Sequence, residues 1–163
     1  MHYRYVIVGG GLAAAAAIEG IRSQDADGSI LLFSRENHLP YRRTPLTKEM
    51  WAGSMKLEDL AVHPEGFYEA HKVDVRLRRE IVEMDSEHKI LWDDRGDSVG
   101  FDHALIVTGC RPRRLQAQGA DSPSVRYFRA LEDFLALEQS MDHIQHVTTV
   151  GGGFVAIELA ATL

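Results

Sequence analysis

Short apolar runs alternate with polar or glycine-rich stretches at the start of the chain, a pattern typical of an α/β protein. Tyr5–Val8 is apolar and β-branched, as expected for a buried parallel strand. Leu12–Arg22 is rich in alanine and predicts a helix. Ser29–Phe33 is apolar again and predicts a second strand, so these elements form one right-handed strand–helix–strand unit.

The middle of the chain predicts a long connection and then a series of short strands. Residues 34–64 are polar and contain three prolines, and a connection of this length inside a compact domain is usually functional. We expect a helical piece near residues 45–51 and a helix from Pro64 to about Lys72, because proline suits the first helical turn. The expected strands are Val73–Leu77, Ile81–Met84, Lys89–Trp92, Ser98–Phe101 and Ala104–Val107. Polar turns around the middle three indicate an antiparallel meander.

The last part of the chain repeats the pattern of its beginning. After a loop over residues 113–127 and a helix over Leu131–Ser140, the β-branched run Val147–Val150 predicts another strand. This run leads into three glycines and an apolar helix, as Tyr5–Val8 does near the other end. The same strand–turn–helix pattern therefore occurs twice, about one domain length apart.

The two glycine-rich turns carry the most specific chemistry in the sequence. Each has the form Gly-x-Gly-x-x-Ala, with Gly9, Gly11 and Ala14 in the first and Gly151, Gly153 and Ala156 in the second. The first glycine makes a tight turn, the second lets the backbone approach a pyrophosphate, and the small third residue lets helix and strand pack closely. The N–H groups at the helix start, at Leu12 and Ala13 in the first turn, would face the anion. Two such turns predict two dinucleotides, FAD and NAD(P)H.

Composition and charge narrow the class of protein. The 163 residues include 18 basic and 24 acidic side chains, and the net charge of −6 argues against a general nucleic-acid or membrane-surface role. No stretch approaches the roughly 18 consecutive apolar residues of a membrane span. Because the first expected strand begins by Tyr5, we expect no targeting peptide and a cytoplasmic protein.

Neither the histidines nor the cysteine suggests a metal or disulfide site. The eight histidines are scattered, and His143 and His146 are expected on the surface, so no metal is predicted. Cys110 is the single cysteine, which excludes an internal disulfide and a Cys-x-x-Cys pair. A reactive thiol beside Arg111 is one alternative, because a nearby cation lowers a thiol pKa. A cysteine without a role is the preferred interpretation.

Residues 39–48, Leu-Pro-Tyr-Arg-Arg-Thr-Pro-Leu-Thr-Lys, connect the sequence to a known family. They resemble the Leu-Pro-Tyr-x-Arg-Pro-Pro-Leu-Ser-Lys segment of oxygenase-type ferredoxin reductases and apoptosis-inducing-factor-like flavoproteins. Residues 101–113 are similar to the family's Ala-Thr-Gly strand end, and residues 151–160 to the start of its NADH domain. All three segments stand in the family's order.

This resemblance implies a fold and a domain plan. The fold would be α/β, with a doubly wound, Rossmann-like parallel sheet that binds FAD, an antiparallel meander, and the truncated start of a second Rossmann-like domain that binds NAD(P). Residues 1–144 would form the first segment of the FAD-binding domain and residues 145–163 the start of the inserted NAD(P)-binding domain. Because Leu163 lies about ten residues into the last expected helix, an N-terminal piece of a longer flavoprotein is expected.

The resemblance also implies roles for individual residues. Lys48 would lie near flavin N5, where positive charge favours the reduced, anionic flavin. Glu158 pairs with this lysine in relatives of the apoptosis-inducing-factor type, so we predict the two within salt-bridge reach as a catalytic pair. Arg43 would neutralise the pyrophosphate or flank the flavin ring. Thr108 and Gly109, at the family's strand end, would contact FAD.

The end of the second strand departs from the family pattern. Family members usually place an acid there to bond the adenosine ribose, whereas this chain has Arg35 with Glu36 beside it. Two alternatives stay open. Glu36, about 20 residues past the glycines, substitutes for the acid, or Arg35 marks altered ribose contacts.

The function that the resemblance implies is FAD-dependent oxidoreduction. NADH would pass hydride to flavin N5, and electrons would go on to a small iron–sulfur ferredoxin, or to a quinone or oxygen. Disulfide reduction is not expected, because the disulfide reductases of this superfamily carry their redox cysteines on the helix after the first Glu-bearing strand, and this sequence has no cysteine there. Two alternatives remain: a catalytically incompetent nucleotide-binding fragment, and a redox signalling protein like apoptosis-inducing factor.

Overall fold

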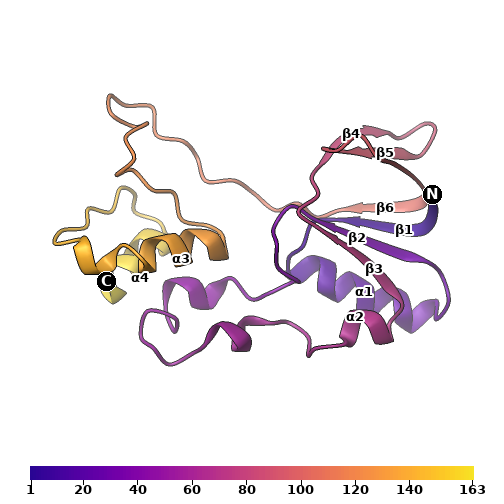
Figure 1. The fold of residues 1–163 in the computed structure, drawn as a ribbon, viewed down its shortest axis with the longest axis horizontal. Helices are drawn as coiled ribbons and strands as arrows, with labels where there is room; N and C mark the ends of the chain where they lie inside the picture. Colours follow the sequence, from indigo (N-terminus) through magenta and orange to yellow (C-terminus); the bar gives the residue numbers. More distant parts are fainter. The chain divides into compact units, whose positions relative to one another are not determined.

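The computed structural model describes residues 1–163 and contains one six-stranded sheet (Figure 1). The strands are β1 (His2–Val8), β2 (Ile30–Ser34), β3 (Val73–Leu77), β4 (Ile81–Asp85), β5 (Ile90–Asp93) and β6 (Ser98–Ile106), in the order β3-β2-β1-β6-β5-β4. The first three strands and β6 run parallel, whereas β5 pairs antiparallel with both β4 and β6. This arrangement confirms the predicted α/β fold with a parallel sheet and an antiparallel meander.

The chain forms two compact units. Met1–Arg42 and Ala61–Gly109 make up the first, which holds the sheet, α1 (Leu12–Gln24) and α2 (Phe67–Ala70). Arg43–Leu60 and Cys110–Leu163 make up the second. Its helices are the 3₁₀ helices η1 (Thr44–Thr47), η2 (Leu57–Leu60) and η3 (Met141–His143), and the α-helices α3 (Leu131–Glu138) and α4 (Phe154–Thr162). None of the helices combines the length and apolar character needed to cross a bilayer. The domain boundary at residue 144 stays a prediction.

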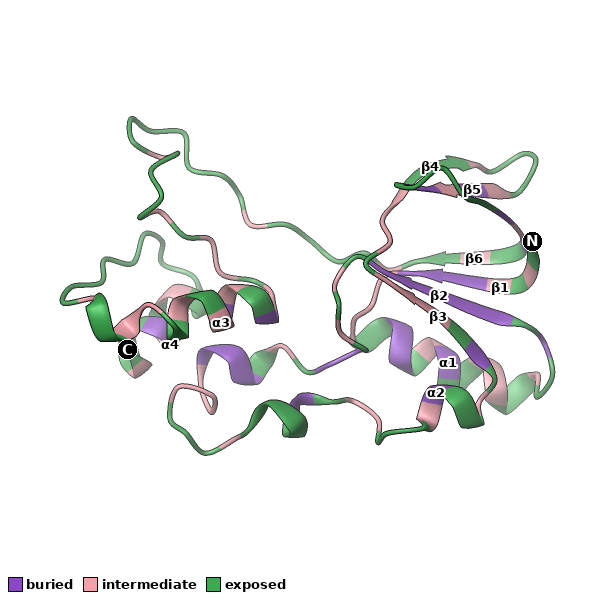
Figure 2. Cartoon of the chain, in the orientation of Figure 1, coloured by how far each residue is buried: buried purple, intermediate pink, exposed green.

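Two apolar clusters, one on each face of the central strands, form the core of the first unit. Figure 2 marks the buried stretches of these strands. On one face, Val6 and Val8 of β1 pack with Leu31 and Phe33 of β2 and with Leu91 of the meander. The other face is covered by α1 and α2, and its buried residues are Ile7, Ala14, Ile18, Ile30, Leu32, Tyr68 and Val73. Burial on both faces explains why β1 and β2 have nearly continuous apolar sequences.

β6 is one continuous strand of nine residues, where the sequence predicted two strands over Ser98–Phe101 and Ala104–Val107. It pairs antiparallel with β5 along its first part and parallel with β1 along almost its whole length. The prediction of two strands was wrong because it took the polar residues Asp102 and His103 as a gap. Both lie within the strand, where their side chains are exposed.

The helices of the middle region are shorter than the sequence predicted. Only residues 67–70 of the helix expected from Pro64 to Lys72 are α-helical. Gly66 has a φ of +81° and delays the start, and Lys72 has a φ of +50°, which is incompatible with helix continuation. The helical piece expected near residues 45–51 is the 3₁₀ helix η1 followed by turns.

The strand predicted over Val147–Val150 is absent, and these residues have no regular secondary structure. They pair with no strand of the sheet, and the side chain of Val150 is 74% exposed. A β-branched run favours extended backbone, but a strand also needs a hydrogen-bonded neighbour. The apolar pattern alone was therefore insufficient here.

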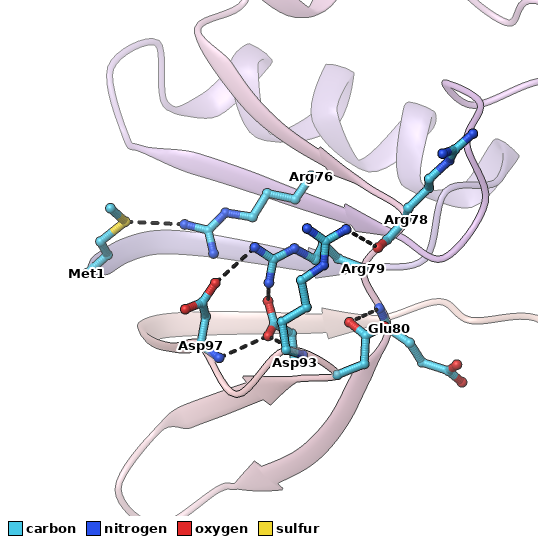
Figure 3. Close-up of polar contacts among 9 residues, drawn as sticks. Met1, Arg76, Arg78, Arg79, Glu80, Asp93 and Asp97 are labelled. Atoms are coloured by element: carbon cyan, nitrogen blue, oxygen red, sulfur yellow. Dashed lines mark hydrogen bonds and ion pairs between the residues drawn. The ribbon is translucent and has the colours of Figure 1, made fainter.

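An ion-pair cluster of Arg79, Asp93 and Asp97 connects the meander to the end of β2 (Figure 3). The guanidinium of Arg79 pairs with Asp93 and, at 2.9 Å, with Asp97. Asp93 is 2% exposed, and its Oδ1 also accepts hydrogen bonds from the backbone N–H groups of Arg95 and Asp97. The backbone N–H of Arg79 donates to the Ser34 carbonyl oxygen. Arg79 therefore links the β5–β6 turn to the edge of the sheet where β2 ends.

We expect Asp93→Ala to lower the free energy of unfolding by about 3 kcal/mol, because it leaves a half-buried guanidinium without its buried partner. Urea unfolding followed by circular dichroism measures this loss. Asp97→Ala is the control, since the Asp97 side chain is 61% exposed and its removal should cost less than about 1 kcal/mol. Equal losses in the two variants would contradict this role for Asp93.

Candidate functional site

The first glycine turn lies at the carboxyl end of β1, between the ends of two neighbouring strands. Gly9 has a φ of +128°, and a Cβ there would collide with the carbonyl oxygen of Val107, directly after β6. A Cβ on Gly10 would collide with the Ser34 side chain at the end of β2. The turn therefore requires glycine because the backbone approaches both neighbouring strands closely.

The start of α1 has donors and open space for an anion. Gly11 is the N-cap residue, no side chain caps the helix, and a Cβ on Gly11 would meet no atom within 4 Å. Leu12 and Ala13 are exposed, whereas Ala14 is buried between helix and sheet. The first backbone N–H groups of a helix have no partner within it and bind anions readily. These residues therefore fit the pyrophosphate of a dinucleotide.

The other predicted residues of this site lie at the same edge of the sheet. β1 lies between β2 and β6 in the sheet. The chain continues from β1 through α1 to β2 on one side, and β6 pairs with β1 on the other side, so the strand order reverses at β1. Ligands of such sheets bind outside the carboxyl ends of the strands at this switch point. Arg35 and Glu36 directly follow β2, and Thr108 and Gly109 closely follow β6.

Arg35 and Glu36 have different partners. The Glu36 carboxylate accepts a hydrogen bond of 2.6 Å from the Tyr41 hydroxyl. The backbone carbonyl oxygen of Glu36 accepts another from the backbone N–H of Arg78. The Arg35 guanidinium lies 3.7 Å from the Glu80 carboxylate. A carboxylate accepts several hydrogen bonds, so Glu36 can serve both Tyr41 and a ribose hydroxyl. Which of the two residues contacts the adenosine ribose stays a prediction.

Lys48 and Glu158 lie together in the second unit, as predicted. The Lys48 ammonium nitrogen is 2.9 Å from Oε1 of Glu158, which projects from α4. Sequence reasoning missed a second contact, in which the Thr47 hydroxyl donates to Oε2 of Glu158 at 2.5 Å. The hydrogen bond from Thr47, followed by the hydrogen bond and charge of Lys48, lowers the pKa of Glu158 from its ordinary value. The carboxylate is therefore held in its ionised form.

Arg43 lies at the start of η1, in the second unit. Its guanidinium donates a hydrogen bond of 3.3 Å to the carbonyl oxygen of Arg129, just before α3. Trp51 packs against Phe134 of α3, with ring centroids 4.8 Å apart. These contacts join residues 43–51 to α3, and the proposed role of Arg43 toward a pyrophosphate stays a prediction.

The second glycine turn repeats the backbone of the first. Gly151 has a φ of +130°, close to the +128° of Gly9, and Gly153 caps α4 with extended backbone and no side-chain cap. The packing differs, because Ala156 is only partly buried whereas Ala14 is fully buried. Local sequence is thus sufficient for the shape of the turn, but packing against a sheet needs a preceding strand.

The pH dependence of the contact between α4 and η1 follows from the lowered pKa of Glu158. A carboxyl whose pKa is lower in the folded chain adds stability above its ordinary value of 4.5 and loses it as the pH falls through the folded value. We expect Glu158→Gln to lower the free energy of unfolding near neutral pH, and this difference from the unaltered chain to shrink below pH 4.5. Urea unfolding of both chains between about pH 3 and pH 7 measures it. A difference independent of pH would contradict the assignment.

A family model and two known proteins match almost the whole chain. The sequence model of the pyridine nucleotide-disulphide oxidoreductase family matches residues 3–163. Apoptosis-inducing factor 1, mitochondrial, of Dictyostelium discoideum is 32% identical over an alignment that covers 99% of this chain and 33% of that protein. The ferredoxin–NAD(+) reductase component of the biphenyl dioxygenase system of Paraburkholderia xenovorans is 34% identical over 156 residues, covering 96% and 38%.

A solved structure agrees with these relatives. The crystal structure of a ferredoxin reductase from Rhodopseudomonas palustris is similar, with a TM-score of 0.90 and 31% sequence identity. The similarity covers 98% of this chain and 39% of that chain. This chain thus spans between a third and two fifths of the length of these three proteins.

Proposed function

Because the chain belongs to the pyridine nucleotide-disulphide oxidoreductase family, we propose that it is part of an FAD-dependent enzyme that oxidises NAD(P)H. The open, uncapped start of α1 at the first glycine turn carries this proposal. There the N–H groups of Leu12 and Ala13 would bind the FAD pyrophosphate. Glu36 would accept a hydrogen bond from the adenosine ribose.

The flavin, when bound, would supply the redox chemistry by accepting hydride from NADH and passing electrons to a ferredoxin or similar acceptor. The protein would supply position and charge. Arg43 would offset the negative charge of the pyrophosphate, and the Lys48 ammonium group would provide positive charge near flavin N5. Glu158 would hold that ammonium group in place through their 2.9 Å contact.

A ferredoxin is the acceptor that the relatives favour. The Paraburkholderia xenovorans relative is named a ferredoxin–NAD(+) reductase component, and the Rhodopseudomonas palustris structure is a ferredoxin reductase. Disulfide reduction is not proposed despite the family's name. The only cysteine, Cys110, is exposed in a loop, whereas disulfide reductases of this superfamily carry a redox pair on the helix after the first Glu-bearing strand.

The second glycine turn would bind the pyrophosphate of NAD(P)H through the start of α4. In this proposal residues 1–144 belong to the FAD-binding domain, and residues 145–163 begin the NAD(P)-binding domain. The absence of a strand before Gly151 favours a second candidate for the chain by itself, namely a fragment that binds FAD without catalysing oxidation. FAD binding with no detectable NADH binding would support this second candidate.

Gly11→Ala tests the FAD site without disturbing the fold. A Cβ there meets no protein atom, so we expect the Tm to fall by no more than about 5 °C. The same Cβ occupies space that a pyrophosphate needs, so FAD affinity should fall at least about tenfold. Quenching of flavin fluorescence measures the affinity.

Gly20→Ala is the matched control for this test. Gly20 lies in α1, and a Cβ there also meets no atom within 4 Å. Its FAD affinity should equal that of the unaltered chain, because Gly20 is remote from the helix start. Tight FAD binding by both variants would refute the proposed position of the pyrophosphate.

Lys48→Met tests the proposed positive charge near the flavin. Removing about 1.4 kcal/mol of stabilisation from the reduced flavin would lower its two-electron reduction potential by about 30 mV. Redox titration of the FAD-loaded protein measures this shift, and Lys48→Arg, which keeps the charge, should show little of it. Equal potentials in Lys48→Met and the unaltered protein would argue against this role for Lys48.

A further inference from the structure

Thr47 and Lys48 are adjacent in the chain, and each contacts a different oxygen of one carboxylate. The Thr47 hydroxyl donates to Oε2 of Glu158 at 2.5 Å, and the Lys48 ammonium group lies 2.9 Å from Oε1. A carboxylate held at both oxygens cannot rotate freely about its last torsion angle. The orientation of Glu158 is therefore set by two donors.

The two donors differ in how firmly the protein holds them. Thr47 is 6% exposed and β-branched, so its side chain has few accessible rotamers. The Lys48 side chain is 43% exposed and flexible, and an ion pair of that exposure adds little rigidity by itself. Thr47 is thus the rigid donor and Lys48 the mobile one.

α4 meets Thr47 at a second point. The hydroxyl of Thr162, one helical turn after Glu158, lies 3.3 Å from the carbonyl oxygen of Thr47 while donating to the Glu158 carbonyl oxygen at 2.9 Å. Both contacts come from one face of α4, because residues four apart lie one above the other. The position of Thr47 against the helix is therefore well defined.

We infer that Thr47 is the positioning residue of the Lys48–Glu158 pair. Its hydroxyl fixes the carboxylate through one oxygen, so that the other oxygen holds the Lys48 ammonium group at a defined place. The consequence for catalysis rests on the proposed function, in which the Lys48 ammonium group acts on the flavin. The contact itself exists in the chain without any cofactor.

Few charged groups surround Glu158, which makes its titration a clean measure of this contact. α4 contains no other titratable residue, and Lys48, directly after η1, is the cation that pairs with Glu158. Arg43, at the other end of η1, donates to the Arg129 carbonyl oxygen. Glu49 follows Lys48, and its Oε2 is buried without a hydrogen-bond partner.

Thr47→Val removes the hydroxyl and keeps the shape, and Thr47→Ser keeps the hydroxyl. Carbon-detected NMR follows the Glu158 carboxyl of each chain through a pH titration, with Glu158→Gln identifying the signal. We expect the midpoint to rise in Thr47→Val, because the hydrogen bond from Thr47 lowers the pKa of Glu158, and to stay at the unaltered value in Thr47→Ser. Should Thr47→Val unfold, Thr47→Ala provides the same comparison.

The outcomes separate this inference from the proposed function. An unchanged midpoint in Thr47→Val, or an equal rise in Thr47→Ser, overturns the positioning role even if the protein binds FAD. A raised midpoint restored by serine supports the role even if FAD does not bind. In FAD-loaded protein, the acid limb of the pH profile of flavin reduction should move with the NMR midpoint.

Discussion

The close approach of backbone segments at the end of β1 is the constraint on which both the sheet and the first candidate site depend. Gly9 and Gly10 lie against Val107 and Ser34, where any side chain would collide with the neighbouring strands. The approach brings the carboxyl ends of three parallel strands to one edge. α1 begins directly after these glycines, and no side chain caps its first N–H groups. Glycine at positions 9 and 10 lets the chain pass close to the neighbouring strands, and glycine at position 11 leaves room for a ligand.

Sequence patterns predicted the elements whose environment is uniform along their length. β1 and β2 are buried on both faces and α1 is alanine-rich with one buried face, so their residue types follow directly from burial. The patterns failed where pairing with a distant segment decides whether residues form a strand. β6 runs through the polar residues Asp102 and His103 because β1 pairs with it there. Val147–Val150 has the residues of a strand but pairs with no neighbour.

The candidate site shows the same division. Glycine spacing alone was enough to predict both turns, since φ near +130° at the first glycine is a local property. The contact of Lys48 with Glu158 was predicted through family resemblance, because no periodicity relates residues so far apart in sequence. The hydroxyl of Thr47 and that of Tyr41 were missed, since neither contact leaves a signal in the spacing of residues. The position of Thr47 beside the lysine to which the family resemblance assigns a role was the only available clue.

The order of strands in the sheet has a consequence for synthesis on the ribosome. β1 emerges before β6, its neighbour on one side, which lies about a hundred residues later in the chain. Until β6 emerges, the nascent polypeptide presents β1 as a bare edge, and only the partnership of β1 with β2 and α1 shields its apolar residues. Translation speed through residues 34–97 therefore sets how long this intermediate is exposed to chaperones and to self-association.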